Sequence, residues 1–270
     1  MKVVETRFIE TVWKFYEQHG RHDLPWRKTT NSYKIVVSEL MLQQTQVSRV
    51  IPKYTEFLER FPTARQLAAV PLGDVLIAWQ GLGYNRRAKY LWQAARVVIE
   101  QSNGRWPKTL SGLKKLPGVG AYTAGAVMNF AYNKPVPLIE TNVRTVYLHH
   151  FFAGASQITD SELLPIVERT LSFDRPREWN WALMDYGSYL KSASGNANVR
   201  SASYKKQSVF KESNRFIRGS ILKLLKTAYH SEAAVIKTLV EIEKNRVKEQ
   251  LNALIAEGMV IKEKRRYRLP

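Results

Sequence analysis

Apolar residues recur at helical spacing through most of the first 190 residues, and this periodicity restricts the chain to a helical fold. The pattern is clear in residues 8–16, 90–98 and 163–171, where large side chains gather on one face. Turn signals built on proline, glycine and asparagine separate such segments, for example at 103–107. We therefore expect an all-α architecture of about ten short helices in this region.

The end of the chain has a different pattern. Residues 216–228, 232–240 and 244–257 are expected helices, and residues 258–269 alternate like a short β-hairpin. Three helices followed by a basic hairpin predict a small winged-helix-like domain at 211–270.

A basic segment separates these two regions. Residues 191–210 are mostly small and polar, and their charged side chains are all Lys or Arg. This composition is typical of a loop or linker. The sequence thus predicts a helical region at 1–190, this basic loop, and the C-terminal domain at 211–270.

The chain is strongly basic. It holds 42 Lys and Arg against 23 Asp and Glu, a net charge of +19 with a pI near 10.0. This excess is more than solubility requires, so we expect a polyanion, usually nucleic acid, as the partner. Residues 211–270 carry 14 of the cations and 7 of the acids, so this segment adds +7. That charge favours an additional grip on DNA, although winged helices also dock proteins and a basic surface can be incidental.

The sequence contains no cysteine, which excludes disulfides, thiolate metal sites and thiol nucleophiles. No apolar run approaches the roughly 20 residues that cross a bilayer, and the N-terminus lacks the apolar core of a signal peptide. We therefore expect an intracellular protein without a membrane partner.

The most informative turn lies at residues 116–120, which read Leu-Pro-Gly-Val-Gly and precede a predicted helix at 121–127. Proline ends the preceding helix, and Gly118 and Gly120 allow another backbone to approach closely. Backbone N–H groups at the start of the next helix, near Ala121, then form a seat for a phosphate. An ordinary Pro-Gly turn between helices is the alternative interpretation.

A lone acid, Glu39, lies in the apolar helical segment 38–47. Such a carboxyl group either caps or pairs structurally, or is held in a partly dry pocket where desolvation raises its pKa. In the second case Glu39 can act as a general acid.

Four motifs in one order give the chain a family resemblance. Leu-Pro-Trp-Arg at 24–27, the segment 38–47, Gly-Leu-Gly-Tyr at 81–84 and the turn at 116–120 resemble the helix-hairpin-helix DNA glycosylases, the superfamily of endonuclease III. Within it the chain is similar to the MutY-type adenine glycosylases over most of its first 207 residues. The resemblance implies that the helical region before the basic loop is a catalytic region of two lobes.

The resemblance also implies catalytic residues. Release of a purine needs an acid that protonates the base and a carboxylate that stabilises the cationic sugar. By position, Glu39 is the proton donor and Glu140 the carboxylate. Tyr122 supports the active-site carboxylate, and Asn142 positions water or the carboxylate. Relatives that cut the strand carry a lysine where this chain has Tyr122, and a phenol cannot form an imine, so we predict hydrolysis without AP-lyase activity.

Binding roles follow from the same resemblance. Trp26 and Arg27 are expected to line the adenine pocket, while Gln44 and Tyr84 wedge into the duplex beside the flipped base. Alternatively, Gln44 is a surface polar residue and Tyr84 a packed aromatic. The remaining expected contacts are phosphate contacts at Gly118, Gly120, Ala121, Lys205 and Lys206, and the backbone carbonyls of Leu116 and Val119 as ligands for a Na or K ion.

At Glu140 the chain departs from the family pattern, which has an aspartate there. The extra methylene adds about 1.5 Å of reach, and errors of about 1 Å can cost roughly a hundredfold in rate. Three outcomes stay open: a compensating backbone shift, which we favour, a slow enzyme, or a site adapted to another base. In a purely structural alternative, Glu140 pairs with Arg144 one helical turn later.

Two further departures concern a cofactor and a domain. Relatives commonly ligate a [4Fe–4S] cluster with four cysteines, and the corresponding places here are Lys191, Asn198, Ser201 and Gln207, none of which replaces a thiolate. We therefore expect no iron–sulfur cluster and no required cofactor. Full-length relatives also carry a Nudix-like domain that recognises the oxidised guanine, where this chain has the winged-helix-like segment.

The predicted function is removal of adenine mispaired with 8-oxoguanine or guanine in double-stranded DNA, by a monomer associated with the cytoplasmic nucleoid. One alternative is a G:T or G:U mismatch glycosylase of the same fold, which shares the hairpin, the helical Glu and the tyrosine. The pair Gln43 and Gln44 and the Gly-Leu-Gly-Tyr segment favour the adenine branch. Another alternative is a non-catalytic DNA-binding protein that uses the winged helix.

Overall fold

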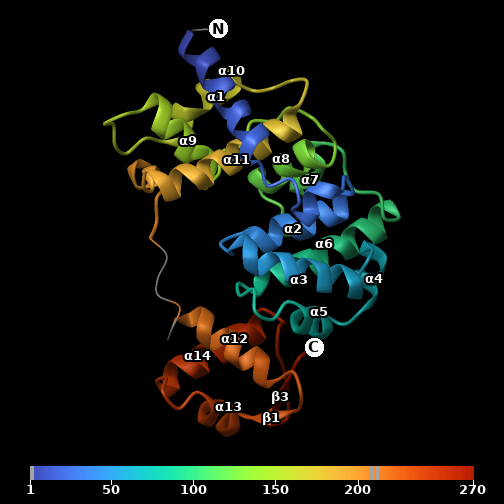
Figure 1. The fold of residues 1–270 in the computed structure, drawn as a ribbon. Coiled ribbons are helices and arrows are strands. Elements are labelled where there is room, and N and C mark those ends of the chain that lie inside the picture. The colour runs from blue at the N-terminus through green and yellow to red at the C-terminus, as the bar shows by residue number, and fades with distance from the viewer. Residues whose placement is uncertain (1–2, 207–209, 211–212) are drawn as a thin grey trace. The chain divides into compact units, whose positions relative to one another are not determined.

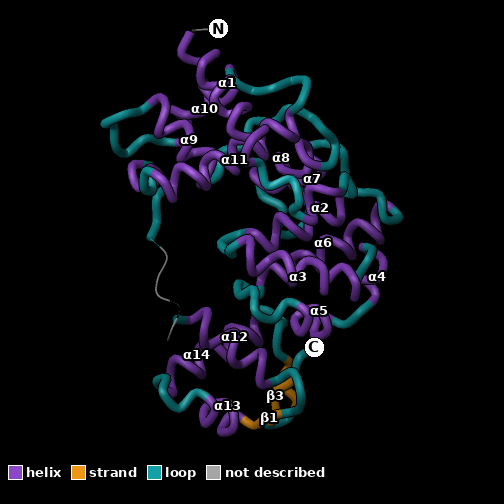
Figure 2. The backbone as a smooth tube through the Cα atoms, viewed as in Figure 1, coloured by secondary structure: helices purple, strands orange, loops and turns teal. Residues whose placement is uncertain are grey.

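The computed structural model describes residues 3–206, 210 and 213–270, and the described chain is mostly helical, as predicted (Figures 1 and 2). It forms two compact units that interleave in sequence. Unit 1 comprises Met1–Ile35, Pro107–Lys115 and Val119–Lys206. Unit 2 comprises Val36–Trp106, Leu116–Gly118 and Gln207–Pro270. None of the described helices is both long enough and apolar enough to cross a membrane.

Unit 1 is built around an aromatic and aliphatic core. Its helices are α1 (Val3–His19), η1 (Pro25–Lys28), α7 (Leu110–Lys114), α8 (Ala121–Phe130), α9 (Thr141–Phe151), α10 (Asp160–Arg169), α11 (Pro176–Ala193) and η2 (Ala197–Arg200). Phe8 of α1 packs with Tyr147 of α9, at 5.1 Å between ring centroids, and with Trp179 of α11, at 6.1 Å. The apolar faces predicted at 8–16 and 163–171 lie on α1 and α10 and supply this core, so burial explains the periodicity.

Unit 2 contains most of α2 (Ser32–Leu42), which begins in unit 1. Its other helices are α3 (Val47–Arg60), α4 (Ala64–Ala69), α5 (Leu72–Ala78), α6 (Arg86–Ser102), α12 (Asn214–Leu224), α13 (Glu232–Thr238) and α14 (Lys244–Ala256). On α6 the predicted apolar face is buried at Leu91, Ala94 and Val98. This helix ends where Asn103 takes the left-handed conformation at φ 46°.

The C-terminal part of unit 2 has the predicted three helices and hairpin. Strands β2 (Ile261–Glu263) and β3 (Arg266–Arg268) pair antiparallel, and β1 (His230–Ser231) pairs with the other edge of β3. In register, His230 lies opposite Tyr267 and Lys262 also lies opposite Tyr267. Strand β1 was not predicted, because two residues are too few to show an alternating pattern.

Candidate active site

The turn at 116–120 joins α7 to α8 as a helix-hairpin-helix element. Gly118 has φ +75°, and a Cβ atom there would lie 2.5 Å from Cβ of Tyr90 on α6, so this position requires glycine. Gly120 has ordinary extended φ and ψ, and a Cβ atom there would meet open space. Gly120 is also the N-cap of α8 and supplies no side-chain cap. The two glycines therefore differ: Gly118 makes the turn, and Gly120 keeps the start of α8 accessible from outside.

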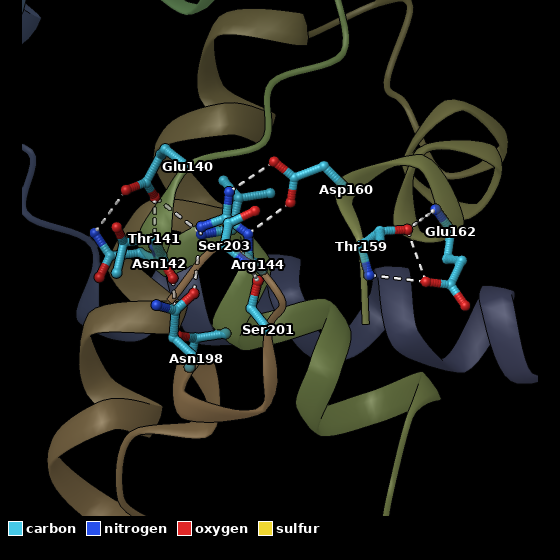
Figure 3. A network of polar contacts seen from close by, with 12 residues as sticks. Glu140, Thr141, Asn142, Arg144, Thr159, Asp160, Glu162, Asn198, Ser201 and Ser203 are labelled. Carbon is cyan, nitrogen blue, oxygen red and sulfur yellow. Dashed lines mark hydrogen bonds and ion pairs between the residues drawn. The ribbon is translucent and has the colours of Figure 1, made fainter. Parts of the chain in front are cut away.

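Glu140 forms the N-cap of α9, where its side chain folds back onto the start of the helix (Figure 3). Its Oε1 accepts hydrogen bonds from the backbone N–H groups of Asn142, at 2.8 Å, and Val143, at 2.9 Å. The Asn142 side-chain amide donates to Oε2 at 3.4 Å. Burial raises the pKa of Glu140 above its usual range, and the two backbone N–H groups partly oppose this rise. The structure thus brings Glu140 and Asn142 together and fixes the direction of the carboxylate.

Arg144 does not supply the ion pair of the structural alternative. Its guanidinium binds Asp160 through Nε at 2.7 Å and Nη2 at 2.8 Å, and also donates to Oδ1 of Asn198 at 3.3 Å (Figure 3). The carboxylate partner of Arg144 is therefore Asp160, which reaches it from the start of α10.

A glycine on α11 holds this turn in place. A Cβ atom at Gly187 would lie 2.2 Å from the carbonyl oxygen of Asn142, closer than any side chain tolerates. Gly187 therefore lets α11 approach the first turn of α9, where Glu140 and Asn142 lie. The packing role of Gly187 was not predicted from the sequence.

The other two predicted catalytic residues, Tyr122 and Glu39, lie far apart in the sequence and belong to different units. Tyr122 lies half-buried in the first turn of α8, in unit 1 with Glu140 and Asn142. Glu39 lies on α2 in unit 2 and is 6% exposed. That Glu39 and Glu140 face one nucleotide stays a prediction.

Trp26 and Arg27 lie on the short helix η1, and both side chains are buried. Arg27 makes a bidentate ion pair with Asp185 of α11, with N–O distances of 2.7 and 2.9 Å. Arg21 binds the same carboxylate through Nε at 2.7 Å. Burial by itself would raise the pKa of Asp185, but the two arginines lower it below its usual value. Sequence reasoning missed Asp185, although an acid in the apolar helix α11 was a usable signal; lining of a base pocket by Arg27 stays a prediction.

The two predicted wedge residues lie on neighbouring loops of unit 2. Gln44 follows α2 with φ 53°, and Tyr84 precedes α6 with φ 48°, both in the left-handed region that non-glycine residues rarely adopt. Such strained positions persist only where surrounding contacts fix them, and they cluster at functional sites. Both residues line one pocket, and their role as a wedge stays a prediction.

Arg87 ties the two wedge loops together, and sequence reasoning missed it. Its buried guanidinium donates to the last turn of α2 and to both loops: the carbonyl oxygens of Leu40, Met41, Gln43, Leu82 and Gly83, and the hydroxyl of Thr45. Burial lowers the pKa of Arg87 to about 10. Backbone carbonyl oxygens cannot be recognised as partners from a sequence, because every residue has one. The only available signal for Arg87 was its position at the start of a predicted helix.

The described part of the predicted basic loop, residues 191–206, is held by polar contacts. Asn198 accepts from Arg144, and Arg200 donates to the carbonyl oxygens of Leu148 and Phe152 at the end of α9. Ser201 forms a parallel bridge with Ile158. The donor atoms of the loop therefore do not fit an iron–sulfur cluster, and no group of His, Cys, Asp or Glu suited to a metal occurs in the described part of the chain. Lys205 and Lys206 are exposed, and Gln207 lies outside the described residues.

Comparison with known proteins defines the class. Residues 37–169, which contain Glu39, the wedge loops, the hairpin and Glu140, match the family of HhH-GPD superfamily base excision DNA repair proteins. With the helical fold and the helix-hairpin-helix element, this match shows that residues 37–169, just under half of the chain, carry a domain of that superfamily.

Within the superfamily the chain is similar to adenine DNA glycosylases. It is 35% identical over 184 residues to the one from Buchnera aphidicola, covering 68% of this chain and 52% of that protein. It is 42% identical over 177 residues to the one from Mycolicibacterium smegmatis, covering 65% of this chain and 60% of that protein. The structure of a thermostable thymine-DNA glycosylase superposes with a TM-score of 0.61 at 28% identity, over 68% of this chain and 86% of that one. The chain thus spans about half to three fifths of the length of these two curated relatives.

Proposed function

We propose that the protein is a monofunctional DNA glycosylase that hydrolyses the N-glycosidic bond of adenine mispaired with 8-oxoguanine or guanine. The observation that carries this proposal is the similarity to adenine DNA glycosylases over about two thirds of the chain. Double-stranded DNA with such a mismatch is the proposed partner, in keeping with the charge of +19.

The proposed mechanism divides the work between two acids. Glu39, which is buried on α2, protonates the adenine ring so that it can leave. Glu140 stabilises the positive charge on the sugar, and its two backbone hydrogen bonds hold the carboxylate ready before substrate arrives. Asn142 holds the second carboxylate oxygen, and Tyr122 supports the same acid. A water molecule then attacks the sugar. Tyr122 stands where lyase-type relatives carry the lysine that forms an imine with the sugar, and a tyrosine cannot form one.

Duplexes with A:8-oxoguanine, A:G, G:T and G:U pairs test the substrate. We expect release of free adenine from the first two, with the strand cut only after alkali. Glu39→Gln should abolish base release and retain duplex binding. Glu59→Gln, an exposed acid of the same unit, is the matched control and should behave as the wild type. Unchanged base release by the Glu39 variant would remove Glu39 from the mechanism.

A G:T or G:U glycosylase is the second candidate function. The likeness to the thymine-DNA glycosylase structure favours it. Release of thymine or uracil with no release of adenine would decide for this candidate and against the adenine proposal.

A further inference from the structure

The wedge residues line a pocket that the C-terminal helices complete. The pocket has a volume of about 370 Å³, within the usual range for small-ligand sites. Gln44 and Tyr84 line it from the wedge loops, while Arg215 and Arg218 of α12 and Gln250 of α14 line it from the C-terminal helices. All of these residues belong to unit 2.

An ion-pair cluster fastens the C-terminal helices to α6 beside the pocket. Glu257, which follows α14, accepts from Arg86 of α6 at 2.5 Å and from Arg218 of α12 at 2.5 Å. Lys89 of α6 also donates to the carbonyl oxygen of Glu257. Charges shared in a half-buried cluster hold geometry better than an isolated surface pair. These ion pairs therefore hold the elements that line the pocket in place within unit 2.

Arg215 makes the most direct contact between α12 and the wedge. Its Nη1 donates to the hydroxyl of Tyr84 at 2.8 Å, and its guanidinium carbon lies 5.1 Å from the centre of the Tyr84 ring. The ring is flanked by a second guanidinium, that of Arg87, at 5.3 Å. A segment more than a hundred residues away in the sequence thus contributes a cation to the wedge.

The residues that line the pocket carry groups that can recognise a guanine base. A guanidinium carries N–H donors in a planar fork that matches O6 and N7 of guanine. In 8-oxoguanine N7 carries a proton, so the guanidinium can donate to O6 while an amide oxygen accepts from N7–H. The pocket offers both, because Gln44 and Gln250 are amides and Arg215 is a guanidinium, whereas both terminal nitrogens of Arg218 bind Glu257. Tyr84 adds an aromatic face on which a base can stack.

We propose that this pocket receives the guanine-type base opposite the excised nucleotide, and that Arg215 of the C-terminal helices reads its edge. The proposal rests on the proposed function, since it identifies the opposite base of that substrate. It makes the C-terminal helices a part of the specificity machinery in addition to any grip on the DNA backbone.

Opposite-base preference tests the proposal. Binding is measured with duplexes that carry a tetrahydrofuran abasic analogue opposite 8-oxoguanine, guanine, cytosine or thymine. Excision is measured under single-turnover conditions with duplexes that carry adenine opposite the same four bases. The wild type should prefer both guanine-type bases over cytosine and thymine. Arg215→Ala should reduce that preference by about tenfold or more in both assays. Arg215→Lys should also lose it, because lysine keeps the charge without the fork.

Lys223→Ala is the matched control, because it removes an exposed cation from the same helix outside the pocket. It should leave the opposite-base preference unchanged. An equal loss on all four duplexes for Arg215→Ala, or a wild type without preference, would overturn the pocket proposal. If the wild type releases no adenine from any of the duplexes, the proposed function is overturned instead. The binding measurements would then still test the pocket proposal.

Discussion

At the scale of the residue, two charged side chains of opposite sign, Glu140 in unit 1 and Arg87 in unit 2, are held mainly by backbone groups. Glu140 is held by N–H groups at the start of α9, and Arg87 by carbonyl oxygens at the end of α2 and in the two wedge loops. A family motif and its extra methylene pointed to Glu140 as a candidate catalytic residue, and that role stays a prediction. The sequence did not predict the role of Arg87, because the partners of Arg87 are backbone atoms that every residue possesses.

Replacement of Glu140 separates function from stability. Burial raises the folded-state pKa, so the folded protein binds the proton more tightly than the unfolded chain, and stability falls as pH rises above the ordinary glutamate value. Glu140→Gln removes this cost and keeps an oxygen that accepts from Asn142 and Val143. In urea unfolding we expect the variant to be at least as stable as wild type at pH 8, with a smaller difference at pH 4. Its excision rate should fall by about a hundredfold or more.

Glu59→Gln again serves as the control, with no change expected in either measurement. A Glu140→Gln protein that is clearly less stable yet fully active would mean that the carboxylate serves the fold alone.

Replacement of Arg87 tests the tie between the wedge loops. Arg87→Met keeps the apolar stem but leaves buried carbonyl oxygens without a donor, so we expect a loss of about 3 kcal/mol in the free energy of unfolding, measured in urea. Arg96→Ala removes an exposed arginine of the same helix, which should cost no more than about 0.5 kcal/mol. Equal effects of the two substitutions would contradict the assigned role of Arg87.

At the scale of the element, apolar spacing predicted which segments are helices better than where they end. The predicted helix at 216–228 ends at Leu224, because the chain then turns toward β1, whose partner strand is β3. The hairpin after α14 was predictable from local alternation, whereas β1 depends on a pairing with residues far along the chain. Helix packing could not be predicted from the sequence either, because the sequence does not show that Gly187 lies against the backbone of Asn142.

A pair of helical glycines tests the contact between α11 and α9. Gly187→Ala places a methyl group against the carbonyl oxygen of Asn142, so the helices must separate, and we expect a loss of about 2 kcal/mol in the free energy of unfolding. Gly219→Ala lies within α12 where a Cβ atom meets open space, so it should stabilise by up to about 1 kcal/mol. Urea midpoints of both variants give the comparison. Gly187→Ala should also slow adenine excision, and full stability with full activity would refute the packing argument.

At the scale of the whole molecule, the proposed chemistry joins parts of the chain that lie far apart in sequence and belong to different units. Glu39 comes from α2 in unit 2, and Glu140 caps α9 in unit 1. Composition and motifs predicted the partner class and both acids, but not the packing that holds each in place. The C-terminal helices were expected to add charge, and the pocket beside Tyr84 gives them a more specific proposed role.

The most direct measurement is a crystal structure of the protein bound to a duplex in which a cationic abasic-sugar analogue lies opposite 8-oxoguanine. The account predicts a Glu140 carboxylate oxygen within about 4 Å of the analogue's charged nitrogen, the distance of an ion pair, with Glu39 on the side from which the base departs. An analogue bound with the two carboxyl groups facing separate surroundings would contradict it.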